Sequence, residues 1–159
     1  MRLTEKATME NAKELRIKAM EEIDKKEISS IQDEMEKRMY DWWGTWKPDY
    51  EGWLKCADSL YAPNAIINAI GGEQLYSDYR TSMKGQRDRC SMEMGPILQS
   101  SVSEDTVSLC YEMYLIPKGL ENPPIFTMMV TEFNKFEEVD GKLMVTRLDL
   151  YTDGGNMPK

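Results

Sequence analysis

The apolar residues of the first part of the chain recur every three or four positions, which is the spacing of amphipathic helices. In the first such segment they form a narrow stripe between charged residues. A capping box at Ser29 and Gln32 predicts the start of a second helix, and Asp49 opens a third. We therefore predict helices over about residues 4–26, from the capping box to Gly44, and from Asp49 to a stop at Pro63.

Beyond residue 64 the pattern changes to the β-branched and alternating residues that are typical of strands. A short strand over Ala65–Ile70 is followed by Gly71-Gly72, which predicts a two-residue hairpin turn. After a strand that pairs back, a short helix is expected over about 78–84, ended by Gly85. The remaining strands are expected as an antiparallel meander, at about 91–102 with an interruption at Gly95-Pro96, and at 107–116, 125–138 and 143–151.

Helices followed by strands are the order of an α+β fold. We predict a cone-shaped, curved antiparallel sheet wrapped around the N-terminal helices, with a central pocket where a small ligand can bind. The first 38 residues carry 9 Lys or Arg and 10 Asp or Glu. We therefore expect a charged helical extension over 1–38, the α+β domain over 39–153 and a tail over 154–159.

The composition excludes several kinds of chemistry. The chain has no histidine, so no histidine base, nucleophile pair or metal ligand is available. Its net charge of −8 argues against nucleic-acid binding, and no apolar run is long enough for a membrane helix. The absence of a secretory signal and three widely spaced cysteines (Cys56, Cys90 and Cys110) predict reduced thiols in a cytoplasmic protein.

Two segments carry a resemblance to a known family. Trp46–Trp53 leads into Leu60–Ile67, and a hairpin over Glu138–Lys142 precedes the last strand. This arrangement resembles the SnoaL-like branch of the nuclear transport factor 2-like superfamily, over about residues 40–151. The resemblance implies the conical fold, a homodimer through the exposed sheet face, and work on small apolar ring compounds without a metal or organic cofactor. Relatives include polyketide cyclases, ketosteroid isomerases, epoxide hydrolases and dehydratases.

Three polar residues are the candidate catalytic groups. The resemblance places Glu93 where related dehydratases carry a histidine, and a buried Glu93 could act as a general acid or base; it could equally face solvent. Tyr40 could polarise a substrate oxygen or merely pack, and Asn68 could bind a ligand or cap a strand edge. The candidate substrate-binding residues are Trp43, Tyr111, Met113 and Leu148. The acidic stretch over 132–138 is interpreted as a solvated strand end.

Two classes of function remain open from the sequence. The first is a cofactor-independent lyase, isomerase or cyclase that moves a proton on a small apolar ring or carbonyl compound, with Glu93, Tyr40 and Asn68 as the reacting trio. The second is a ligand-binding or dimerisation module of the same fold without catalysis. A pocket lined by apolar side chains alone would favour the second, and converging polar groups would favour the first.

Overall fold

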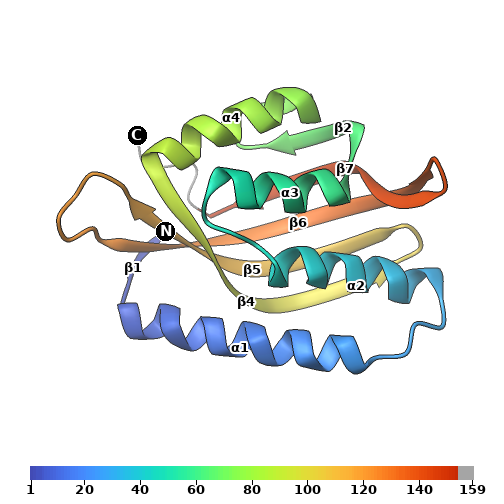
Figure 1. Ribbon diagram of the computed structural model, residues 1–159, viewed down its shortest axis with the longest axis horizontal. Coiled ribbons are helices and arrows are strands. Elements are labelled where there is room, and N and C mark those ends of the chain that lie inside the picture. Colours follow the sequence, from blue (N-terminus) through green and yellow to red (C-terminus); the bar gives the residue numbers. More distant parts are fainter. Residues whose placement is uncertain (154–159) are drawn as a thin grey trace.

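The computed structural model describes residues 1–153, so the predicted tail over 154–159 lies outside the described residues. Its elements follow the order of helices first and long strands later, which confirms the α+β class (Figure 1). In chain order they are β1 (Arg2–Thr4), α1 (Lys6–Lys25), α2 (Ile31–Gly44), α3 (Tyr50–Leu60), β2 (Tyr61–Ala69), β3 (Gly72–Leu75), α4 (Tyr76–Arg89), β4 (Cys90–Ser103), β5 (Thr106–Pro117), β6 (Ile125–Val139) and β7 (Lys142–Thr152).

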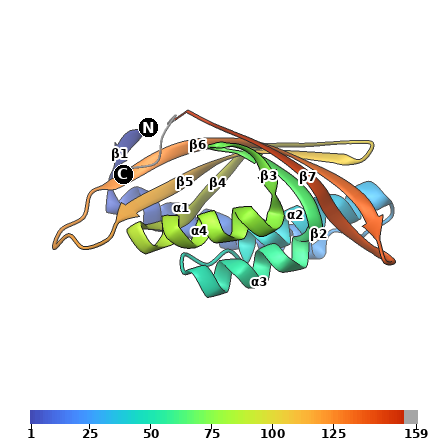
Figure 2. The same ribbon diagram turned by 90° about the horizontal axis from the view of Figure 1, so that it is seen from above.

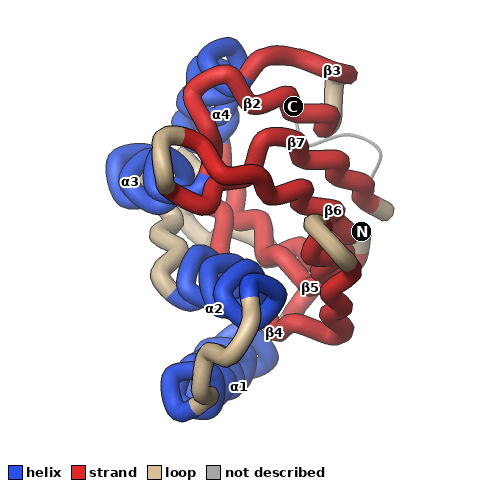
Figure 3. Tube along the Cα trace, turned by 90° about the vertical axis from the view of Figure 1, so that its right-hand side faces the viewer, coloured by secondary structure: helices blue, strands red, loops and turns tan. Residues whose placement is uncertain are grey.

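The strands form one curved sheet in the order β3-β2-β7-β6-β5-β4. The sheet arches over the helices in Figure 2, and Figure 3 shows the helices on one side of it. The short strand β1 pairs with the first residues of β6, ahead of the stretch that pairs with β7. Bulky apolar side chains of α2, α3 and the inner sheet face form the core, so a single buried layer lies between helices and sheet.

The prediction that the sheet is antiparallel throughout is wrong at one position, because β2 and β7 run parallel. Their register places Ile67 opposite Leu148. The other pairs along the sheet are antiparallel, and most of them are joined by a direct turn that dictates their direction. No turn connects β2 to β7, so the residue pattern of either strand leaves their relative direction undetermined.

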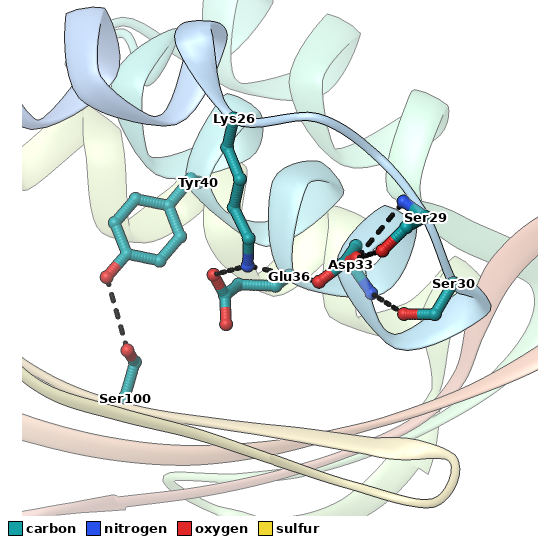
Figure 4. Close-up of polar contacts among 7 residues, drawn as sticks. All are labelled: Lys26, Ser29, Ser30, Asp33, Glu36, Tyr40 and Ser100. Atoms are coloured by element: carbon teal, nitrogen blue, oxygen red, sulfur yellow. Dashed lines mark hydrogen bonds and ion pairs between the residues drawn. The ribbon is translucent and has the colours of Figure 1, made fainter.

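The start of α2 lies one residue later than predicted. Ser30 is the N-cap, and its hydroxyl accepts a hydrogen bond from the backbone N–H of Asp33 at 3.1 Å. The Asp33 carboxylate in turn accepts hydrogen bonds from the backbone and hydroxyl of Ser29 (Figure 4). The ion pair with Lys26 is the main reason that the pKa of Asp33 falls below its usual value. A reciprocal cap is thus present, but Asp33 replaces Gln32 in it.

Two glycines were expected to break elements that the structure continues. The helix α4 runs through Gly85 to Arg89, and its buried residues Met83 and Arg87 face the rest of the protein on both sides of the glycine. The strand β4 likewise runs through Gly95, where the register with β5 shifts. Tertiary packing therefore overrides the local preference of glycine for a break at both positions.

The charged N-terminal helix is docked against the rest of the protein. The helix α1 contacts β4 and α2, and it buries Ala12 and Ile23. The β4 strand lies at one edge of the sheet, so α1 covers part of an edge (Figure 1). Among residues 1–153, no helix combines the length and apolar character needed to cross a membrane.

Candidate functional site

A cavity of about 50 Å³ lies between the helices and the inner face of the sheet. That volume holds roughly four water molecules. Half of its lining residues are aromatic residues or methionines, and one is a carboxylate: Trp42, Trp46, Trp53, Tyr61, Tyr79, Tyr111, Met83, Met92, Met113, Met128 and Glu132. Its uncharged polar lining residues are Gln74, Ser82, Gln86 and Thr152. Because methionine side chains are unbranched and flexible, these walls can rearrange to admit a ligand larger than the empty space.

Glu132 is the charged group of the cavity wall. Its side chain is 0% exposed, and it lies on β6 opposite Leu109 of β5 and Leu150 of β7. The Tyr111 hydroxyl donates a hydrogen bond of 2.9 Å to one carboxylate oxygen, and the Asn134 amide donates one of 3.1 Å to the other. Burial raises the pKa of Glu132 to about 7, although both hydrogen bonds act to lower it. Near neutral pH this carboxyl group can therefore both accept and release a proton.

Glu132 was not among the predicted site residues, because the acidic stretch was interpreted as solvated. The strand alternation carries a signal for it. Val130, Glu132, Asn134 and Phe136 are all buried, whereas the residues between them lie on the other face. An acid that shares its face with Val130 and Phe136 is expected inside, and this periodicity places Glu132 in the core.

Two further phenols lie near Glu132. Tyr61 and Tyr79 line the cavity, and their hydroxyls make no hydrogen bond to other residues within 1–153. Burial raises the pKa of Tyr61 well above its usual value and that of Tyr79 to about 12, and the negative charge of Glu132 adds to both shifts. Both groups consequently stay protonated at physiological pH. They can donate hydrogen bonds to a ligand oxygen.

A buried arginine lies behind the wall of the cavity. Arg87 of α4 is 1% exposed, and its guanidinium carbon lies 4.8 Å from the ring centre of Trp46 and 5.1 Å from that of Trp53. Its Nη1 donates a hydrogen bond of 3.0 Å to the sulfur of Met92. Burial lowers the pKa of Arg87 to about 10, so the group keeps its positive charge at neutral pH.

The structure brings three of the four predicted substrate-binding residues to the cavity. Tyr111 and Met113 of β5 and Leu148 of β7 line it. Trp43 does not line it, because its indole packs in the core and donates a hydrogen bond of 2.9 Å to the carbonyl of Gly95. The neighbouring Trp42 takes the cavity position instead.

The three candidate catalytic residues lie apart from the cavity and from one another. Glu93 is on the face of β4 opposite Met92 and Met94, where Lys13 of α1 pairs with it at 3.7 Å. The structure contradicts the expectation that Glu93 faces the pocket. Alternation groups residues by face, and the buried face of this strand is the one that carries the methionines.

Tyr40 and Asn68 also make their contacts elsewhere. The Tyr40 hydroxyl lies 3.2 Å from the Ser100 hydroxyl (Figure 4). The Asn68 amide donates a hydrogen bond of 3.0 Å to Asp149, which lies on the face of β7 opposite Leu148 and is held by Arg147. Neither residue is part of the cavity wall, so the predicted trio does not converge.

Residues 1–153 contain no group of three or more acidic or cysteine side chains placed to hold a metal ion. The three cysteines, Cys56, Cys90 and Cys110, are free thiols. The cavity with Glu132 combines a buried carboxylate with apolar walls, which makes it the candidate functional site.

Comparisons with known proteins agree with this architecture. No family profile matches the sequence, and no curated protein does. Among solved structures, a provisionally named polyketide cyclase from Xanthomonas campestris matches with a TM-score of 0.60 and 13% identity, over 77% of this chain and 92% of its own. A SnoaL-like polyketide cyclase, also provisionally named, from Jannaschia sp. CCS1 gives 0.59 and 14%, over 80% and 91%.

A third match is AclR from Streptomyces galilaeus, provisionally named a hydroxylase, with a TM-score of 0.59 and 16% identity, over 76% of this chain and 79% of its own. At such identities the likeness establishes the fold. The curved sheet over helices therefore has the fold of these structures, one of which is named SnoaL-like, as the sequence motifs predicted.

Proposed function

We propose that this protein is a cofactor-independent lyase, isomerase or cyclase that transfers a proton on a small apolar ring or carbonyl compound, with Glu132 as the acid and base. The observation that carries the proposal is the burial of Glu132 in the cavity wall, which raises its pKa to about 7. A group with this pKa is poised for general acid–base catalysis at neutral pH. The likeness to structures named polyketide cyclases supports the same class of chemistry.

The arrangement suits a step through an enolate. The ionised Glu132 takes the proton from a carbon next to a carbonyl, and the electron pair of the broken C–H bond moves onto the carbonyl oxygen. The hydroxyls of Tyr61 and Tyr79 donate hydrogen bonds to that oxygen as its negative charge develops. Glu132 then returns its proton to another carbon in an isomerisation, or to a departing hydroxyl in a dehydration. Tyr111 holds the carboxylate in place throughout.

A binding protein without catalysis is the second candidate. It is favoured by the small cavity and its mainly apolar and aromatic walls, which suit the retention of an apolar ligand. In that case Glu132 and Tyr111 would serve as a buried polar anchor for one ligand group. The two candidates differ in one measurable property, the exchange of carbon-bound hydrogen in the ligand.

The test is deuterium exchange at the carbon next to the carbonyl, measured by proton NMR in D2O with a panel of small cyclic ketones. The wild-type protein is expected to accelerate exchange of at least one ketone, and Glu132→Gln to reduce that rate by about 10²–10⁴-fold. Glu138→Gln is the matched control, because Glu138 is an exposed acid on the same strand. Exchange that survives Glu132→Gln would remove Glu132 from the mechanism, and a panel with no exchange would favour the binding protein.

A further inference from the structure

Arg87 lacks the acceptors that a buried guanidinium normally has. It is 1% exposed, and its Nε and Nη2 are buried with no hydrogen-bond partner among residues 1–153. Its one hydrogen bond goes to the thioether of Met92, which is a weak acceptor. Buried charges are ordinarily paired, and a hydrogen-bond donor left unpaired in the interior destabilises the protein, more so when it is charged.

The aromatic neighbours of Arg87 stabilise its buried charge in part, but they leave its N–H groups without oxygen acceptors. The rings of Trp46 and Trp53 attract the positive charge at 4.8 and 5.1 Å. They supply no oxygen acceptor for the N–H groups, which form a planar fork suited to two oxygens of one carboxylate. The nearby acid Asp49 does not supply one, because its carboxylate caps α3 by accepting from the N–H of Gly52 at 2.8 Å.

The side chain of Met92 lies between the cavity and Arg87. Met92, Trp46 and Trp53 all line the cavity, so the guanidinium lies directly behind its wall. The backbone carbonyl of Met92 accepts a hydrogen bond of 2.8 Å from Trp46, which fixes the strand while the side chain keeps its own rotamers. Rotation of this flexible side chain would uncover the guanidinium without moving β4.

We propose that the cavity takes a small ligand with an apolar body and a carboxylate, and that the carboxylate displaces the Met92 thioether to bind Arg87. This inference names the substrate class of the site, and it rests on the proposed function for what happens at Glu132. The carboxylate end of the ligand lies at α4 and the reacting end at β6. The neutral ketones of the exchange panel fill the reacting end alone.

The experiment compares benzoate with benzamide, which share a ring and a size but differ in charge. Binding is measured by the quenching of tryptophan fluorescence, because Trp42, Trp46 and Trp53 line the cavity. At about pH 6, where Glu132 is mostly protonated, the wild-type protein is expected to bind benzoate at least about tenfold more tightly than benzamide. Arg87→Gln is expected to bring that ratio close to one, and Arg89→Gln, an exposed position on the same helix, to leave it unchanged.

A second measurement needs no variant. In the wild-type protein the Nε–H signal of Arg87, followed by 1H–15N NMR, is expected to shift with benzoate and not with benzamide. Equal binding of both compounds, no binding of either, or a preference for benzoate that persists in Arg87→Gln would each overturn the inference. Glu132→Gln separates the two proposals, since it should abolish exchange of ketones and keep the preference for benzoate.

Discussion

Glu132 shows how strongly the position of a single residue changes its chemistry. The same glutamate on the outer face of β6 would be an ordinary solvated acid. Inside, leucines of the neighbouring strands flank it, and Tyr111 and Asn134 each bind one of its oxygens. Burial disfavours the charged form more than these hydrogen bonds favour it, so the pKa rises from 4.5 to about 7.

This shift makes stability depend on pH. Between about pH 4.5 and 7 the folded protein keeps a proton on Glu132 that the unfolded chain has released. The folded state therefore binds more protons there, and the free energy of unfolding falls as the pH rises through this window, by about 3 kcal/mol in total. Urea unfolding of the wild-type protein and of Glu132→Gln at several pH values from about 4 to 8 measures this contribution.

The variant should lose this part of the pH dependence, because glutamine does not titrate. The exposed Glu138→Gln provides the control and should keep the wild-type slope. Identical slopes for the wild-type protein and Glu132→Gln would show that Glu132 has an ordinary pKa in the folded state. That result would also remove the main support for its role as an acid and base at neutral pH.

At the scale of a residue, the sequence predicted part of the site. Tyr111, Met113 and Leu148 do line the cavity; Tyr111 and Met113 share a face because residues two apart in a strand point the same way, and the resemblance assigned that face to the cavity. Glu93 was assigned to the wrong face by analogy with the position of a family residue. The burial of Arg87 could not have been predicted from its own sequence context. It depends on Trp53 of α3 and on Trp46 of the loop before that helix.

At the scale of an element, substitutions of two glycines are expected to have opposite effects on stability. A Cβ at Gly95 would lie 2.7 Å from the backbone carbonyl oxygen of Glu112 on β5, whereas a Cβ at Gly85 of α4 would meet nothing within 4 Å. We expect Gly95→Ala to destabilise the protein by about 1–3 kcal/mol, because two paired strands would have to separate. Gly85→Ala should stabilise it by about 0.5–1 kcal/mol, since alanine favours a helix more than glycine does.

Urea unfolding midpoints of the two single variants and the double variant measure these effects. The two sites are on different elements and should contribute additively. An increase in stability from Gly95→Ala would contradict the close approach of β4 and β5 at this position. A loss of stability from Gly85→Ala would show that α4 does not continue through residue 85.

The boundaries of elements were predictable where local chemistry fixes them. Asp49 opens α3 as expected, because its side chain accepts from the backbone N–H of Gly52. The length of α4 and the continuity of β4 were not, because both depend on contacts made across the fold. The parallel pairing of β2 with β7 belongs to the same class, since it joins segments about eighty residues apart.

At the scale of the whole molecule, the outer face of the sheet carries an apolar area. Phe133 and Tyr151 are 42% and 57% exposed, and their rings form an edge-to-face pair with centres 6.3 Å apart. Met129 lies on the same face of β6. We propose that this face joins two copies of the chain, as the resemblance implies, because exposed apolar clusters commonly mark interaction surfaces.

The mass in solution tests this proposal. Light scattering after size-exclusion chromatography is expected to give twice the 18.5 kDa of one chain for the wild-type protein. Tyr151→Lys should shift the mass towards a single chain, because it places a charge in the apolar contact. Lys142→Ala, at the start of the same strand, is the control and should not change it. A wild-type mass of one chain would refute the dimer.

The parallel contact between β2 and β7 has a consequence for how the protein is made. Leu148 and Leu150 of β7 form part of the cavity, and β7 can dock beside β2 only after the segment of about eighty residues between them has been synthesised. Contacts between such distant segments make folding slow. A nascent chain without β7 lacks Leu148 and Leu150 and therefore this part of the cavity wall. The cavity is therefore completed by the pairing of distant strands, after the helices on its other side have been synthesised.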